Sequence, residues 1–139
     1  SDFEHLSIFF FAAIQIVLDV TVADSFFMRR FIMKRYGMTL RLQPGAYEEY
    51  KRLHSAVWPS VLKMISECNI RNYSIYHKDG YLFSYFEYVG KNFAADMKKM
   101  ADEPETQRWW AVCMPLQQPL ETRKEGEWWA DMEELFHYD

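Results

Sequence analysis

The sequence predicts an α+β fold, on three observations of hydrophobic spacing. Residues 35–42 alternate apolar and polar side chains, which is the period of two typical of a half-buried strand. Residues 70–77 and 81–89 are two further β-rich runs, and the Asp-Gly pair between them is a strong hairpin signal. The segments between and after these runs carry apolar residues at helical spacing. Strands and helices are therefore expected to pack into one mixed domain.

A helical region follows the first strand, which ends at Pro44-Gly45. Residues 46–53 form its first helix, with two glutamates in the first turn, where the positive end of the helix dipole favours carboxylates. The Trp58-Pro59 step interrupts or restarts this helix, because proline is tolerated near a helix start. Residues 60–67 then continue it with an apolar stripe made of Val61, Leu62, Met64 and Ile65.

The second half of the chain repeats this pattern after the hairpin. Residues 92–101 are predicted to form a helix, and another is predicted from residue 105 to Met114, ended by Pro115. Residues 116–127 contain proline, glycine and several charges, which is typical of a loop. Residues 128–136 are predicted as the last strand, although their apolar residues follow neither period cleanly.

The resulting order, β-α-β-β-α-β, is the ferredoxin-like arrangement, in which helices cover one face of a four-stranded antiparallel sheet. A chain of 139 residues and 16.8 kDa is large enough for one hydrophobic core but too small for two. Residues 33–139 are therefore interpreted as a single domain. Its second sheet face needs a cover, which in a short chain is usually the sheet of a partner.

Composition limits the classes of function. A hydrophobic fraction of 50% with 26% charged residues is ordinary for a soluble domain, whereas 18% aromatic residues is high. Aromatic rings serve a core, a subunit interface or a sugar site, where they stack on the C–H groups of the ring. A net charge of −4 and a pI near 5.6 argue against nucleic acid as a partner, because its phosphates are bound by Lys and Arg.

Cysteine and histidine spacing predicts no metal site. Cys68 and Cys113 match neither a zinc motif nor a secreted disulfide scaffold, so we expect free thiols in a reducing compartment, the cytoplasm. The four histidines are scattered along the chain without ligand spacing: His5, His54, His77 and His137.

Residues 1–32 are predicted to be an N-terminal extension to this domain. Residues 6–18 are almost continuously apolar, yet they are too short for a transmembrane helix. Asp2 and Glu4 precede them where a secretory signal requires Lys or Arg, so neither a membrane span nor a signal is expected. We expect the segment to pack as an extra strand or helix on its own domain or on a neighbouring subunit.

The most informative block is EEYKRLH at 48–54, followed by Trp58-Pro59. Positions four apart lie on one helix face, so Tyr50 and His54 can address one small molecule together. His54 is the best candidate for a general acid or base, because imidazole has the side-chain pKa nearest neutrality. The alternatives are a capping or surface histidine for His54 and a core phenol for Tyr50.

Two further blocks follow in order, NYSIY at 72–76 and QRWW at 107–110. The three blocks together resemble those of the L-rhamnose mutarotases, over about residues 33–139. The resemblance implies a dimeric α/β barrel in which two sheets face each other, and therefore a homodimer. It also implies an isomerase that interconverts the anomers of a 6-deoxyhexose, most simply L-rhamnose, without a cofactor.

Carried over residue by residue, the resemblance assigns the catalytic proton donor to His54. It assigns the sugar contacts to Tyr50, Tyr73, Trp109 and Trp110. Tyr73 shares its strand face with Arg71 and Ile75, so a buried structural tyrosine is an alternative. Adjacent helix positions point about 100° apart, so one tryptophan of the pair can stack on a sugar while the other packs into the core.

Mutarotation makes modest chemical demands that this chain can meet. A proton must reach the ring oxygen while another leaves the anomeric hydroxyl, and one acid and one base suffice, each contributing about 10²- to 10⁴-fold. The sequence has no dinucleotide, phosphate-loop or nucleophile-elbow motif. The chain departs from the family at QQPLE, 117–121, where members often carry an Asn-Pro-rich segment, so L-fucose or another 6-deoxyhexose remains an alternative substrate.

The fold class is also used by proteins with other functions. Ferredoxin-like dimers serve as ligand-binding or regulatory modules and as small cofactor-free oxygenases. A binding module would keep its ligand affinity after His54→Ala, whereas an oxygenase would consume oxygen with an aromatic substrate. The Tyr50/His54 block favours the mutarotase.

Overall fold

The computed structural model describes residues 33–139, and its long elements follow the predicted order. The long strands are β1 (Lys34–Leu42), β2 (Ile70–Lys78) and β3 (Tyr81–Tyr88). The helices are α2 (Tyr47–His54), α3 (Pro59–Glu67), α4 (Phe93–Ala101) and α5 (Pro104–Cys113), and a 3₁₀ helix, η2 (Met114–Leu116), follows. Two short strands come last, β4 (Gln117–Gln118) and β5 (Ala130–Asp131). The predicted extension, 1–32, lies outside the described residues.

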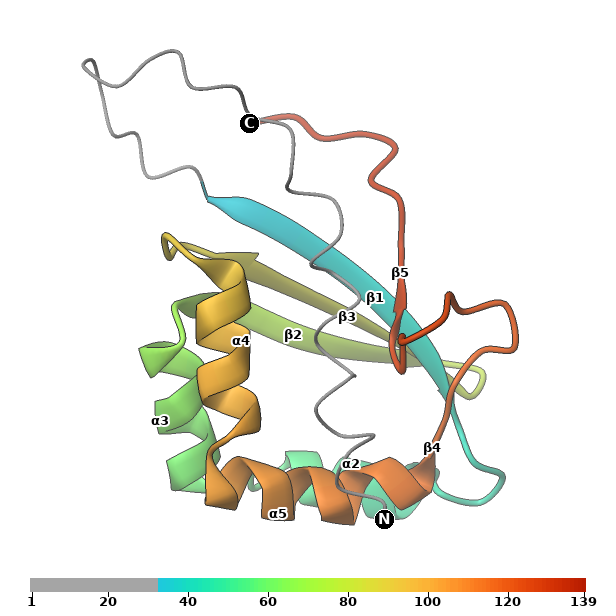
Figure 1. The fold of residues 1–139 in the computed structure, drawn as a ribbon. Coiled ribbons are helices and arrows are strands. Elements are labelled where there is room, and N and C mark those ends of the chain that lie inside the picture. The colour runs from blue at the N-terminus through green and yellow to red at the C-terminus, as the bar shows by residue number, and fades with distance from the viewer. Residues whose placement is uncertain (1–32) are drawn as a thin grey trace, which may run out of the picture.

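β1 runs through the interior of an antiparallel sheet whose strand order is β2-β3-β1-β4 (Figure 1). It pairs with β3 from Lys34 opposite Tyr88 to Arg41 opposite Tyr81. The helices gather on one side of this sheet (Figure 1). The predicted α+β, ferredoxin-like fold is thereby confirmed.

Alternation along β1 decides which side chains meet the helices. Tyr36, Leu40 and Leu42 are at most 8% exposed, whereas Arg41 between them is exposed. Residues directly opposite on β3 share the same sheet face, and Leu82 opposite Leu40 is buried as well. The predicted period of two therefore separates a helix-covered face from an open face.

The β2–β3 hairpin contains the predicted two-residue turn. Asp79 and Gly80 both have positive φ, at 52° and 81°, which is the backbone twist that suits a tight antiparallel turn. Strand β2 is irregular near its start, where its register with β3 shifts between Arg71 and Ser74. This β-bulge inserts one residue, Asn72, whose φ is 50°. It reverses the alternation that follows along the strand.

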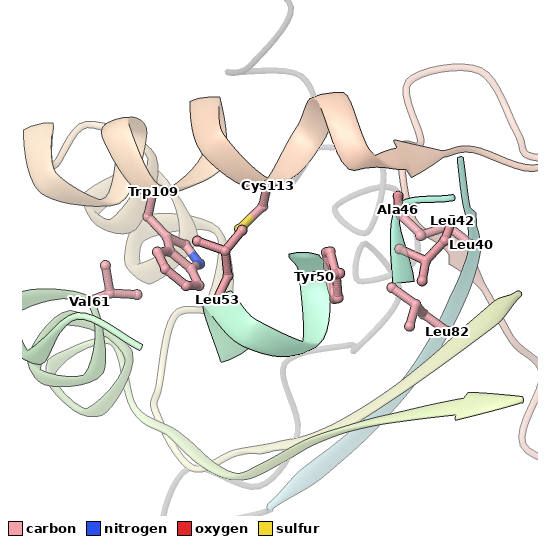
Figure 2. Packing of buried hydrophobic residues seen from close by; sticks show 9 residues of the cluster. All are labelled: Leu40, Leu42, Ala46, Tyr50, Leu53, Val61, Leu82, Trp109 and Cys113. Carbon is pink, nitrogen blue, oxygen red and sulfur yellow. The ribbon is translucent and has the colours of Figure 1, made fainter. Parts of the chain in front are cut away.

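One hydrophobic cluster lies between helices α2, α3 and α5 and the strands (Figure 2). Tyr50 and Leu53 extend from α2, Trp109 and Cys113 from α5 and Val61 from α3, and they meet Ala46 and the strand residues Leu40, Leu42 and Leu82. A second cluster lies between α3, α4 and the other end of the sheet, and it is formed by Tyr36, Cys68, Ile70, Phe86, Tyr88, Met97 and Met100.

The last predicted strand, 128–136, is wrong in extent. The edge of β1 is shared instead by two short strands, because β4 pairs at Arg41 and Leu42 while β5 pairs at Met38 and Thr39. The predicted loop 116–127 therefore contains β4 at its start. Beyond β5 the chain has no regular structure, since its apolar residues do not alternate and cannot bury one face. Met114 also belongs to η2 and not to the preceding helix.

None of the helices in residues 33–139 is long and apolar enough to cross a membrane.

Candidate functional site

A cavity of about 100 Å³ lies between the helices and the covered face of the sheet. All five residues that the sequence singled out contribute to its lining: Tyr50, His54, Tyr73, Trp109 and Trp110. The structure therefore brings the three sequence blocks, which are far apart in the chain, around one space.

The floor of the cavity is a row of side chains across three strands. Ser84 on β3 is paired with Met38 on β1 and with Ile75 on β2, and all three line the cavity. Paired residues lie on the same sheet face, so the row places one buried hydroxyl, that of Ser84, between two apolar side chains.

Tyr50 and His54 form one wall, which we call the α2 wall. Their rings stack with centroids 4.1 Å apart and planes 20° from parallel. This contact follows from their spacing, because residues four apart on a helix lie on one face. The sequence predicts both residues and their proximity.

The protonation of His54 follows from its hydrogen bond. Its Nδ1 lies 2.9 Å from the backbone oxygen of Tyr50, and a carbonyl can only accept, so Nδ1 carries the proton. In the neutral ring Nε2 is then the basic nitrogen. Burial lowers the pKa of His54 below its usual value of 6.5, against the smaller opposing effect of that hydrogen bond. At neutral pH the His54 ring is therefore uncharged, and its Nε2 can act as a base.

The Tyr50 hydroxyl lies deep in the structure, and the residue is 5% exposed. The side-chain amide of Gln117 donates a hydrogen bond to its oxygen at 3.1 Å. Burial is the main cause that raises the pKa of Tyr50, and the nearby Tyr73 phenol raises it further. The Tyr50 hydroxyl therefore keeps its proton near neutral pH.

Tyr73 reaches the cavity because of the bulge in β2. Ile70 and Tyr73 both face the helices although they are three positions apart, which a regular strand does not allow. The residue is 44% exposed, yet burial around its hydroxyl raises the pKa of Tyr73 to about 12. The ring thus spans from the surface to the cavity.

The two tryptophans of α5 have different surroundings. Trp109 is 6% exposed, and its ring meets those of His54 and Trp58 edge to face at centroid distances of 5.3 and 5.2 Å. Trp110 is half-buried and packs against both hydrophobic clusters. Both line the cavity, and Trp109 also belongs to the core.

A second wall, which we call the edge wall, consists of Gln117, Trp128 and Trp129. The sequence did not predict their place in the site, because Gln117 fell in the predicted loop 116–127 and the two tryptophans in the predicted strand 128–136, and none of the three was assigned a sugar contact. The signal that could have found them is the adjacent tryptophan pair, which fits neither strand nor helix spacing. The indole nitrogen of Trp128 donates to the side-chain oxygen of Gln117 at 2.8 Å.

Met114 and Cys113, to which the sequence assigned no part in the site, also line the cavity from the end of α5. Cys113 is 3% exposed, and burial raises the pKa of its thiol to about 12. A thiol with so high a pKa is not a nucleophile at neutral pH, because the thiolate is the reactive form. Cys113 therefore contributes to the shape of the cavity and not to its chemistry.

The lining as a whole is neutral and mixed in polarity. Among residues 33–139, no Asp, Glu, Lys or Arg side chain lines the cavity. Nor does any group of three or more His, Cys, Asp or Glu in this range have the arrangement to hold a metal ion. One imidazole, two phenols, an amide and a hydroxyl surround a space bounded by indole rings, which suits an uncharged ligand with both hydroxyl and C–H surfaces.

Comparison with known proteins agrees with this description. A family model described as L-rhamnose mutarotase matches residues 35–138. The chain belongs to the L-rhamnose mutarotase family. Relatives named L-rhamnose mutarotase include one from Sinorhizobium fredii, 33% identical over 97 residues, which are 68% of this chain and 88% of that protein. Another from Bacillus subtilis is 32% identical over 110 residues, 77% of this chain and 100% of that protein.

A solved structure from the same family supports the fold. The crystal structure of an L-rhamnose mutarotase from Formosa agariphila superposes with a TM-score of 0.60 at 19% sequence identity. The alignment covers 76% of this chain and 99% of that one. The family resemblance that the sequence blocks predict is therefore confirmed, and a mutarotase is by definition an isomerase that acts on sugar anomers.

Proposed function

We propose that this chain interconverts the α and β anomers of L-rhamnose by acid/base catalysis, with His54 as the group that moves the proton. Family membership and the neutral cavity support the reaction class. The observation that carries the role of His54 is its hydrogen bond to the Tyr50 carbonyl, which holds the proton on Nδ1 and turns a basic Nε2 away from the backbone.

The chemistry can proceed through one imidazole. Nε2 takes the proton of the anomeric hydroxyl, and the C1–O5 bond breaks with its electron pair moving onto the ring oxygen. The imidazolium then protonates that oxygen, which gives the open-chain aldehyde and neutral His54. Rotation about C1–C2 followed by the reverse exchange closes the ring on the other face of the carbonyl. General acid/base transfer of this kind contributes about 10²- to 10⁴-fold.

The four aromatic residues are proposed as sugar contacts. The hydroxyls of Tyr50 and Tyr73 can bond ring substituents, while Trp110 presents a half-buried indole to C–H groups. Trp109 contacts His54 edge to face, so its part is to hold the imidazole as much as to touch the sugar.

Exchange NMR on the anomeric protons tests this function. We expect the protein to accelerate α/β exchange of L-rhamnose, and more weakly that of L-fucose, and we expect His54→Ala to abolish the acceleration. A His137→Ala variant is the matched control, because His137 is exposed near the end of the chain and does not line the cavity. Absence of exchange with both sugars would contradict the proposed activity, and undiminished exchange in His54→Ala would contradict the role of His54.

We also propose that the chain forms a homodimer through the open face of its sheet. Three aromatic residues of this face, on the adjacent strands β2 and β3, are exposed, Tyr76 at 68% and Tyr81 and Phe83 at 38% each. An apolar sheet face of this kind is normally covered by a partner. Sedimentation velocity should show dimers, and Phe83→Asp should give monomers, whereas Leu62→Asp on the exposed side of α3 should not.

The cytoplasm is the proposed location. Cys68 and Cys113 are both free and buried, as expected of a chain that stays in a reducing compartment.

A further inference from the structure

Gln117 occupies an unusual position for an amide side chain, because it is 6% exposed and lies between two aromatic hydrogen-bonding groups. It is opposite Leu42 in the β1–β4 pair, so its side chain lies on the covered face of the sheet. Its carbonyl end meets the indole nitrogen of Trp128 at 2.8 Å, and its amino end meets the hydroxyl of Tyr50 at 3.1 Å.

Only one orientation of this amide satisfies both neighbours. An indole N–H can donate but never accept, so the Gln117 oxygen must face Trp128. The Gln117 nitrogen must then face Tyr50, and an amide nitrogen can only donate. The Tyr50 oxygen therefore accepts this bond, and its own proton has to point in another direction.

We infer that Gln117 is a positioning residue that commits the Tyr50 hydroxyl to donate its proton into the cavity, toward an oxygen of the sugar. This inference rests on the proposed function and extends it from His54 to the edge wall. Burial of the hydroxyl, which raises the pKa of Tyr50, keeps the proton available for donation.

The consequence is a matched pair of groups on the α2 wall. Tyr50 donates, and the adjacent His54 accepts at Nε2, with the two rings stacked at 4.1 Å. A pyranose carries the complementary pair on one carbon, because the ring oxygen at C1 can only accept while the anomeric hydroxyl can donate. The pair therefore selects the anomeric carbon, and the Tyr50 hydrogen bond stabilises the charge that develops on the ring oxygen as the C1–O5 bond breaks.

The isosteric change Gln117→Glu tests this inference. A carboxylate only accepts, so it would bond both Trp128 and Tyr50 as donors and turn the Tyr50 proton away from the cavity. We expect kcat/KM for L-rhamnose to fall by about 10- to 100-fold, mainly in kcat, because the lost hydrogen bond strengthens in the transition state. Gln118→Glu is the matched control, since Gln118 is the exposed neighbour on β4 and should change the rate by less than about twofold.

A double-mutant cycle separates positioning from general damage. If Gln117 acts through the Tyr50 hydroxyl, adding Gln117→Glu to Tyr50→Phe should lower the rate no further than Tyr50→Phe alone. Multiplicative losses in the double variant would overturn the inference.

A second readout does not depend on activity. The side-chain NH₂ protons of Gln117 in the unmodified protein should exchange with solvent much more slowly than those of Gln118, and their shifts should move in Tyr50→Phe and in Trp128→Phe. Exchange as fast as that of Gln118, or shifts insensitive to Tyr50→Phe, would overturn the inference even if Gln117→Glu fails to fold. Wild-type protein that shows the protected amide but no sugar exchange would refute the proposed function and leave the orientation established.

Discussion

The two walls of the cavity are built in different ways. The α2 wall holds Tyr50 and His54 within one turn of a single helix, and its geometry is internal to that helix. The edge wall is assembled from a two-residue strand and from a tryptophan eleven positions later in the chain, joined by one side-chain hydrogen bond. The proposed proton-transfer groups thus lie on a regular element, whereas the edge wall, on an irregular one, reaches the Tyr50 hydroxyl through the side chain of Gln117.

The largest expected difference is in stability, between Trp109 on α5 and Trp128 in the edge wall. Trp109→Ala should cost about 3–5 kcal/mol of unfolding free energy, because it leaves a cavity in the core beneath the α2 wall. Trp128→Ala removes a half-buried ring and should cost less than about 2 kcal/mol while still reducing activity. Urea unfolding of both variants measures this difference. Equal losses would mean that the edge wall is as much a part of the core as α5.

The two walls should also differ in their response to pH, because His54 titrates whereas the edge wall contains no titratable side chain. The folded pKa of His54 lies below 6.5, so the unfolded chain binds more protons in the window between the two values. The contribution of His54 to stability is therefore complete above about pH 6.5 and is lost as the pH falls toward the folded pKa. The rate should fall in the same direction, because Nε2 must be unprotonated to act as a base.

Denaturant titrations and exchange rates between pH 5 and 8 would check this expectation. His54→Gln should remove its share of the pH dependence of stability. Trp128→Phe should lower the rate and leave the pH midpoint unchanged, and a midpoint that moves in this variant would show that the two walls are electrostatically coupled.

The smallest expected effect concerns the segment that follows the edge wall. Arg35 and Glu134 form a two-point ion pair with distances of 3.0 and 3.1 Å, on the surface beside β1. Exposed pairs contribute little, so Glu134→Gln should change Tm by no more than about 2 °C, as should the control Glu133→Gln. A larger shift that persists in high salt would show that this pair, and not β5, holds the end of the chain on the sheet.

The elements that the sequence predicts are those with local causes. The alternation of Tyr36, Leu40 and Leu42 is visible within eight residues, and Asp79-Gly80 encodes its turn by the backbone angles these residues tolerate. The Tyr50/His54 pair is likewise a matter of one helical turn. Each of these features can be deduced from neighbours in the sequence.

The features that the sequence does not predict depend on contacts between residues far apart in the chain. Gln117 acquires its role from Tyr50, which is 67 positions earlier, and from Trp128, and neither contact leaves a periodic pattern. The bulge at Asn72 was equally invisible, since one inserted residue shifts a strand without changing its composition. A strand of two residues is too short to show any alternation, which is why the end of the sheet was predicted incorrectly.

The neutrality of the cavity has a consequence for which sugars can enter. A phosphate or carboxylate on the ligand would have to leave water and find no cation among the described lining residues. Burying an unpaired charge costs several kcal/mol or more, which would weaken binding by at least a hundredfold or so. We therefore expect the cavity to bind a free sugar more tightly than its phosphorylated form.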